Sequence, residues 1–147
     1  MTAKKVVCLA CGQTNRLPEE KLGAAPKCGT CGAGLMPAKP IEIDAATFAK
    51  ASRTDEVTLV VDFWAPWCGP CRAMAPQYAA AAQAMQGRAR FAKLNTEDHP
   101  EPGARQGIRG IPTMVIYRGG REVARVSGAR SSSQIVEWVR QQTAQKA

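Results

Sequence analysis

The spacing of the cysteines limits what this chain can fold into more than any other feature of its sequence. All six cysteines fall into three Cys-x-x-Cys pairs, namely Cys8/Cys11, Cys28/Cys31 and Cys68/Cys71. The first residues, MTAKKVVCLACGQ, contain an apolar run shorter than the roughly 7–15 residues of a signal-peptide core. In a chain without an export signal, such pairs favour metal binding or redox chemistry over a secreted disulfide framework.

The rest of the composition excludes a membrane protein and fits a cytoplasmic location. No window approaches the ~18 consecutive apolar residues of a membrane-spanning helix. The net charge of +8 is compatible with acidic partners, but the arginines are scattered singly and form no basic run. We therefore expect no membrane partner and consider a nucleic-acid partner unlikely.

The first two pairs predict a zinc ribbon. Cys8 and Cys11 are followed by Gly12, Cys28 and Cys31 are followed by Gly32, and sixteen residues separate the two pairs. A glycine after the second cysteine allows a tight turn with positive φ, so that two sulfurs of each turn converge on one metal. Two structural disulfides and iron held by the same four sulfurs are the alternatives.

The segment around these cysteines is too poor in core residues to fold alone without such a staple. The first aromatic residue is Phe48, so this segment also lacks aromatic side chains on which bases could stack. A Met-Pro-Ala-Lys-Pro stretch, Met36 to Pro40, is typical of a short stiff linker. We predict two domains, a zinc-ribbon module over residues 1–38 and a larger domain over residues 39–147.

The larger domain shows alternating strand and helix patterns, which predict an α/β sheet with helices on both faces. Val57 to Trp64 is a mostly apolar, β-branched run of the kind found in a central strand. Asp44 is suited to cap one helix, and Ser131 with Gln134 has the spacing of a capping box for the last one. The other expected elements are strands at 41–43, 91–95, 113–117 and 122–127, the last two flanking a Gly119-Gly120 turn, and helices at 68–86 and 99–106.

The third pair lies where the central strand passes into a helix. Residues three apart in a helix are close enough for a disulfide, and the first sulfur faces free backbone N–H groups that stabilise a thiolate. A metal site here lacks ligands, because His99 is the only histidine and the other four cysteines are assigned. A permanent bridge closing so small a ring would add little stability. Reversible redox chemistry therefore fits Cys68 and Cys71 best.

Three stretches resemble the thioredoxin family over essentially all of residues 41–147. They are VDFWAPWCGPC (Val61 to Cys71), AKLNTED (Ala92 to Asp98) and GIRGIPT (Gly107 to Thr113), and the four-cysteine segment is similar to the zinc-carrying bacterial subclass called thioredoxin 2. The resemblance implies the thioredoxin fold, a central mixed sheet flanked by helices, behind a small zinc ribbon. It also implies one structural zinc ion, no tightly bound organic cofactor, and a protein-disulfide reductase for cytoplasmic proteins, recharged by an NADPH-dependent thioredoxin reductase.

The same resemblance assigns roles in the catalytic site. Cys68 is expected to attack the substrate disulfide and Cys71 to resolve the mixed disulfide. Burial among the apolar residues of its strand should raise the pKa of Asp62, which suits a general acid and base for Cys71, and Lys93 is expected to tune it. The residues expected to dock the substrate are Trp67, Gly69, Pro70, Ile111, Pro112 and Gly128, with Pro112 in the cis form.

Several alternatives stay open at this point. Asp62 and Lys93 could be ordinary surface charges, and we expect Trp64 and Trp138 in the core and His99 in an exposed loop. A disulfide oxidase or isomerase is a second enzymatic hypothesis, although Gly69-Pro70 between the cysteines favours a reductase. A third, non-catalytic hypothesis is that the zinc module acts as a redox-sensitive metal switch or a binding adaptor.

Overall fold

A five-stranded mixed sheet forms the centre of the larger domain. The structure is a computed structural model that describes residues 3–144. The strand order is β3-β5-β4-β6-β7, with β3, β5 and β4 parallel to one another and with β6 and β7 antiparallel. The strands are β3 (Ile41–Glu42), β4 (Thr58–Trp64), β5 (Ala89–Asn95), β6 (Thr113–Arg118) and β7 (Arg121–Ser127).

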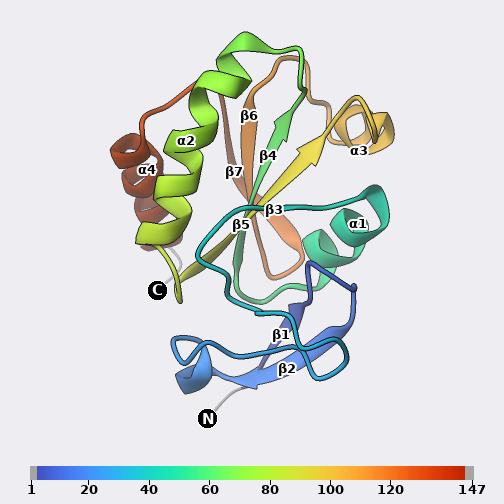
Figure 1. Cartoon of the computed structure of the whole chain (residues 1–147), viewed down its shortest axis with the longest axis vertical. Helices are drawn as coiled ribbons and strands as arrows, with labels where there is room; N and C mark the ends of the chain where they lie inside the picture. The colour runs from blue at the N-terminus through green and yellow to red at the C-terminus, as the bar shows by residue number, and fades with distance from the viewer. Residues whose placement is uncertain (1–2, 145–147) are drawn as a thin grey trace.

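Helices cover both faces of this sheet, as the alternating pattern predicts (Figure 1). The helices α1 (Ala45–Thr54) and α3 (Pro100–Arg105) lie on one face, and α2 (Gly69–Ala84) and α4 (Ser132–Ala144) lie on the other. Two apolar clusters fill the space between sheet and helices, one around Phe48 and Phe63 and one around Tyr78 and Phe91. None of the helices in residues 3–144 combines the length and the apolarity that a membrane span needs.

The local signals for helix ends and turns are confirmed. The side chain of Asp44 accepts a hydrogen bond from the N–H of Thr47 at 2.8 Å. Ser131 Oγ accepts from the N–H of Gln134 at 3.2 Å, and Gln134 Oε1 accepts from the N–H of Ser131 at 2.9 Å, which completes the capping box. Gly120 has φ of +84° in the β6–β7 turn, where a Cβ would lie 2.7 Å from the carbonyl oxygen of Arg53.

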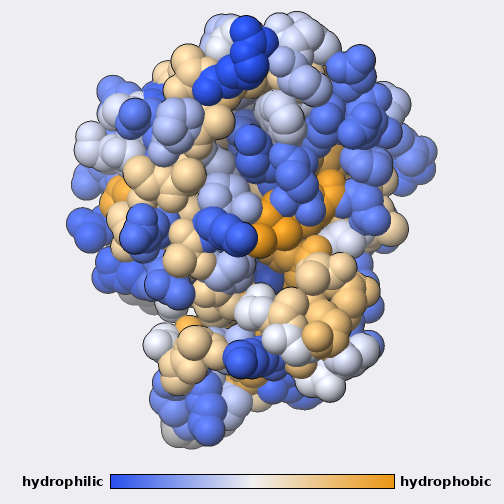
Figure 2. All heavy atoms as spheres, in the orientation of Figure 1, coloured by the Kyte–Doolittle hydropathy of each residue, from blue (hydrophilic) through white to orange (hydrophobic). Residues whose placement is uncertain are grey.

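The N-terminal module is a two-stranded antiparallel ribbon that extends the core of the larger domain. It consists of β1 (Ala3–Val7), β2 (Thr14–Pro18) and the short 3-10 helix η1 (Glu19–Lys21). Val7 and Leu9 are buried against the cluster around Phe48, and Val6 is buried beside Val57. Figure 2 shows apolar side chains at the surface over β3 and the start of α1, close to where the ribbon meets the larger domain.

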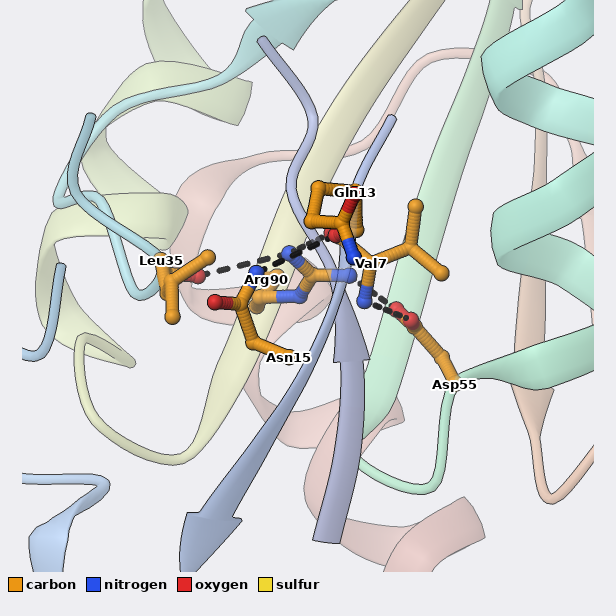
Figure 3. Close-up of polar contacts among 6 residues, drawn as sticks. All are labelled: Val7, Gln13, Asn15, Leu35, Asp55 and Arg90. Carbon is orange, nitrogen blue, oxygen red and sulfur yellow. Dashed lines mark hydrogen bonds and ion pairs between the residues drawn. The ribbon is translucent and has the colours of Figure 1, made fainter. Parts of the chain in front are cut away.

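A buried ion pair joins the ribbon to the larger domain. Arg90 at the start of β5 and Asp55 after α1 contact each other, and both side chains are almost completely buried. Arg90 Nη1 donates to the carbonyl oxygens of Val7 and Leu35 at 2.7 and 3.3 Å, and Asp55 Oδ1 accepts from the N–H of Val7 at 2.8 Å (Figure 3). The pair therefore satisfies ribbon backbone groups, while Nε of Arg90 has no hydrogen-bond partner among the described residues. The division between residues 38 and 39 stays a prediction.

Candidate functional site

Cys68 lies at the N-terminus of α2, directly after the central strand β4. It is the N-cap residue of the helix, and its Sγ accepts the N–H of Cys71 at 3.2 Å. Sγ of Cys68 also lies 3.8 Å from the carbonyl oxygen of Ile111. The N–H donor and the positive end of the helix dipole both favour the thiolate form of Cys68.

Cys68 and Cys71 form a disulfide in this structure, with their Cα atoms 5.2 Å apart. Cys68 is 4% exposed and lines an open hollow, whereas Cys71 is 2% exposed and is not among the residues that line the hollow. Pro70 occupies the first turn of the helix, where its missing N–H costs no hydrogen bond. A partner disulfide in the hollow would therefore meet Cys68 first.

The hollow beside Cys68 has a volume of about 560 Å³ and lies between the start of α2 and the β5–β6 connection. Of the six residues expected to dock a substrate, four line it: Trp67, Gly69, Pro70 and Ile111. The side chain of Trp67 is 67% exposed. Thr96, Ile108 and Arg109, which the expected set did not include, line it as well.

The two other residues of the expected docking set are not among the residues that line the hollow. The Ile111–Pro112 peptide bond is cis, as expected from the resemblance, and Pro112 is buried. The N–H of Gly128 donates to the carbonyl oxygen of Pro112 at 2.8 Å, so Pro112 and Gly128 adjoin each other. Together they adjoin Ile111, which directly precedes Pro112 and lines the hollow.

Asp62 is a buried carboxyl on the central strand. Its side chain is 1% exposed, and its Oδ1 has no hydrogen-bond partner among the described residues. Burial raises the pKa of Asp62 to about 7, with Lys93 opposing the rise. A carboxyl with such a pKa can both hold and release a proton at neutral pH.

Lys93 pairs with Asp62 in the parallel register of β4 and β5, but its ammonium group lies elsewhere. Lys93 Nζ is 4.2 Å from the centroid of the Trp64 ring. Trp64, the last residue of β4, is only half-buried and belongs to neither core cluster, so the expectation of a core tryptophan is wrong at this position. Trp138 is also only partly buried but packs against the core cluster of α2 and α4.

The four ribbon cysteines form a second cluster of sulfurs. All four Sγ atoms lie within 4.8 Å of one another, and the Cys8–Cys31 and Cys11–Cys28 pairs are 3.7 Å apart. A tetrahedral site with Zn–S bonds of about 2.3 Å has sulfur–sulfur edges of about 3.8 Å. The donor set and these distances therefore fit a zinc ion.

Both turns that hold these sulfurs have the same backbone pattern. The N–H of Gly12 donates to the carbonyl oxygen of Cys8, and the N–H of Gly32 donates to that of Cys28. Gly12 and Gly32 have φ of +83° and +80°, as the sequence predicts. Asn15 Nδ2, which the sequence gave no reason to single out, donates to Cys28 Sγ at 3.5 Å, and its Oδ1 accepts the N–H of Gly29.

Arg90 was also missed, for a reason that can be traced to one strand boundary. The expected strand begins at Phe91, whereas β5 begins at Ala89 and therefore includes Arg90. A charged residue inside an apolar strand is a signal for a buried partner. The correct boundary would have made Arg90 a candidate.

Comparison with protein families assigns the two parts of the chain separately. Residues 39–141 match the family described as Thioredoxin, and residues 7–33 match the one described as Thioredoxin 2, N-terminal. The first match contains Cys68 and Cys71, and the second contains the four ribbon cysteines.

Individual relatives agree with these matches. The chain is 40% identical to Thioredoxin C-3 of Corynebacterium nephridii over 141 residues, which cover 96% of this chain and 97% of the relative. It is 42% identical to Thioredoxin 1 of Nostoc sp. over 88 residues, covering 60% and 82% of the two chains. Among solved structures, chloroplastic thioredoxin z superposes with a TM-score of 0.66 at 32% identity, covering 72% of this chain and 96% of that one.

Proposed function

Because this chain belongs to the thioredoxin family of thiol–disulfide oxidoreductases, we propose that it reduces disulfide bonds in cytoplasmic proteins through Cys68 and Cys71. The main support is the asymmetry of the pair: Sγ of Cys68 accepts a backbone N–H at the start of α2 and lines the open hollow, while Cys71 is buried behind it. We therefore assign the attack on the substrate disulfide to Cys68 and the release of the substrate to Cys71.

The first step is an attack of the Cys68 thiolate on one sulfur of the substrate disulfide. The Cys68–substrate bond forms, the substrate disulfide breaks, and the departing sulfur takes a proton from water. The N–H of Cys71 and the helix N-terminus stabilise the attacking thiolate before this step.

In the second step Cys71 gives its proton to the Asp62 carboxylate and attacks Sγ of Cys68. The Cys68–Cys71 disulfide forms, and the second substrate sulfur leaves as a thiolate that is then protonated. The substrate gains two electrons and the cysteine pair loses them. We assign this proton transfer to Asp62 because burial raises its pKa to about 7, and we assign tuning of that pKa to Lys93.

Substrate docking is proposed for the hollow beside Cys68. Trp67, Pro70 and Ile111 give it apolar walls, and the backbone next to the cis Pro112 is free to pair with an extended substrate segment. Gly69 and Gly128 would let that segment approach closely. Docking through backbone groups and a shallow apolar wall suits many protein sequences.

The ribbon would hold one zinc ion through Cys8, Cys11, Cys28 and Cys31. A zinc ion held by four thiolates is a structural cross-link with no open ligand position. We therefore assign the ribbon a structural role. The reduced form of Cys68 and Cys71 would be restored by an NADPH-dependent thioredoxin reductase.

Insulin reduction tests the proposal. The reduced protein should precipitate insulin B chain at a rate that depends on both cysteines, and Cys71→Ser should accumulate a covalent adduct with insulin that dithiothreitol releases. Cys28→Ser serves as the control, since it changes a cysteine outside the pair and should trap nothing. An active protein whose Cys71→Ser variant forms no adduct would contradict the assigned roles.

A further inference from the structure

Three charged side chains lie in one row across the sheet, and the mechanism above uses only two of them. Glu42 on the edge strand β3 is paired with Lys93 on β5, and Lys93 is paired with Asp62 on β4. Paired residues of neighbouring strands point to the same face and lie about 4.8 Å apart. Glu42 therefore stands two strand spacings from Asp62, on the same face of the sheet.

Burial increases steadily along this row. Glu42 is exposed, Lys93 is partly exposed, and Asp62 is buried. Glu42 lines a hollow of about 570 Å³ together with Trp64, Asn95 and His99, on the side of the larger domain that faces the ribbon. The row thus extends from the solvent-accessible carboxylate of Glu42 to the buried carboxyl of Asp62, to which the proposed mechanism assigns the proton of Cys71.

Lys93 forms an ion pair with neither Glu42 nor Asp62 in the described residues. Within residues 3–144, its ammonium group makes no ion pair of 4.0 Å or less, and Nζ lies over the Trp64 ring. A cation on a flexible stem between two carboxylates is shared by both. The charge of Glu42 therefore affects Asp62 directly through space and also through the position of Lys93.

We propose that Glu42 is a positioning residue for the resolving step: from the edge of the sheet it competes for Lys93 and so sets the pH at which Asp62 exchanges its proton with Cys71. This inference rests on the proposed function of Asp62. The proton leaves the Cys71 thiol and is held by the Asp62 carboxylate. It passes to water after Cys71 has bonded to Cys68, so the net charge of the three side chains in the row is the same before and after the step.

The other groups packed around Asp62 do not replace Glu42 in this role. Helix α2 buries two titratable side chains toward the sheet, Cys71 and Tyr78. The hydroxyl of Tyr78 lies 2.8 Å from the carbonyl oxygen of Ala92, and burial raises its pKa well above the usual value. On β6, the residue paired with Asp62 is the uncharged Met114. The charge of Glu42 acts on the pKa of Asp62 in the direction opposite to that of Lys93.

The test is a carbon-13 NMR titration of the Asp62 carboxyl in the reduced, zinc-loaded full chain. Glu42→Gln should lower the titration midpoint of Asp62 by about half a pH unit, because a negative charge about 10 Å away is removed and Lys93 is released toward Asp62. Glu42→Asp should largely restore the midpoint. The shift should shrink in 1 M KCl, since Glu42 is exposed and its field is screened.

Glu97→Gln is the matched control, because Glu97 is an exposed acid beyond the end of β5, the strand of Lys93, and lies outside the row. A midpoint that moves equally in Glu42→Gln and Glu97→Gln, or in neither, would overturn the proposal. The titration also separates this proposal from the proposed function, because it needs no substrate. Failure to reduce insulin with a shifted midpoint would contradict only the function, and normal reduction with an unshifted midpoint would contradict only the role of Glu42.

Discussion

The ribbon and the catalytic domain carry the same Cys-x-x-Cys spacing in two different backbone settings. In the ribbon a glycine with positive φ follows each pair, the chain turns back, and four sulfurs from two turns converge. In the catalytic domain Arg72 follows the pair, α2 continues, and the two sulfurs bond to each other. In this chain the residue after the second cysteine therefore distinguishes the proposed metal-binding turns from the disulfide pair.

Backbone N–H groups point at sulfur in both regions, so thiolate stabilisation does not distinguish them. Cys28 Sγ accepts the N–H of Thr30, just as Cys68 Sγ accepts the N–H of Cys71. The two regions differ in whether a sulfur remains accessible to another molecule. Four thiolates around one ion leave no ligand position open, whereas Cys68 adjoins a hollow of about 560 Å³ and Asp62 is buried in the strand just before it.

Replacing one sulfur in each region should have the largest effects. Cys68→Ser should lower insulin reduction by at least about a thousandfold, because a serine hydroxyl is not ionised at neutral pH and cannot form the mixed disulfide. Zinc content, measured by mass spectrometry of the metal, should stay near that of the parent protein.

Cys11→Ser should give the opposite result. It removes one of the four proposed zinc ligands, so zinc should be lost at moderate chelator concentration, while alkylation of Cys68 at neutral pH should remain fast. If alkylation of Cys68 became slow in Cys11→Ser in parallel with the loss of zinc, the two regions would be one functional unit.

Breaking the buried ion pair should have the next largest effect. Arg90→Met leaves Asp55 buried without its cation and deprives the carbonyl oxygens of Val7 and Leu35 of a donor. The free energy of unfolding in urea should fall by about 3–5 kcal/mol. Arg88→Met, at an exposed arginine two residues earlier, should change it by less than about 0.5 kcal/mol.

The double variant Arg90→Met/Asp55→Asn shows whether the loss comes from the unpaired charge. It should recover part of the stability, because no buried carboxylate is then left alone. Equal losses in Arg90→Met and Arg88→Met would mean that the ribbon is not held by this pair.

The sequence predicted the parts whose chemistry is local. Strand β4, the caps at Asp44 and Ser131, and the glycines after both ribbon pairs follow from short patterns, and the structure has each of them. The contact between ribbon and domain could not be predicted in this way. It brings Val7, Asp55 and Arg90 together from three distant segments, and a local sequence pattern does not indicate contacts between distant segments.

The candidate site shows the same limit. The resemblance located Cys68, Cys71, Asp62 and Lys93, but Glu42 enters only through the register of the edge strand. Register depends on which strands become neighbours, and the parallel order β3-β5-β4 is a property of the whole sheet. A surface glutamate on a short strand carries no signal of its own.

Asp62 should make the stability of the catalytic domain depend on pH. Its folded-state pKa of about 7 lies above the unfolded value of 3.8. The folded state therefore binds the proton more tightly, and stability falls as pH rises from about 4 to about 7 and is level above that. Over this window the stability of the parent relative to Asp62→Asn should fall by at most about 4 kcal/mol.

Urea unfolding of the reduced proteins at pH 4.5, 6 and 8 measures this difference. Asp98→Asn is the control, because Asp98 is exposed beyond the end of β5. A difference between parent and Asp62→Asn that stays constant with pH would mean that the carboxyl is already ionised at pH 4.5.

Trp67 should give the smallest effect and the sharpest separation between docking and chemistry. Among residues 3–144 it is the large apolar side chain left exposed, and it stands directly before Cys68 at the wall of the hollow. Trp67→Ala should raise KM for insulin about tenfold, the loss of one aromatic contact worth about 1–2 kcal/mol at an interface. The rate with a small aromatic disulfide should change less than twofold, because such a substrate needs little of the wall and Cys68 keeps its N–H donor from Cys71. Equal losses of reduction rate with both substrates would show that Trp67 acts on the Cys68 thiolate itself. The assignment of the hollow as the docking surface would then be wrong.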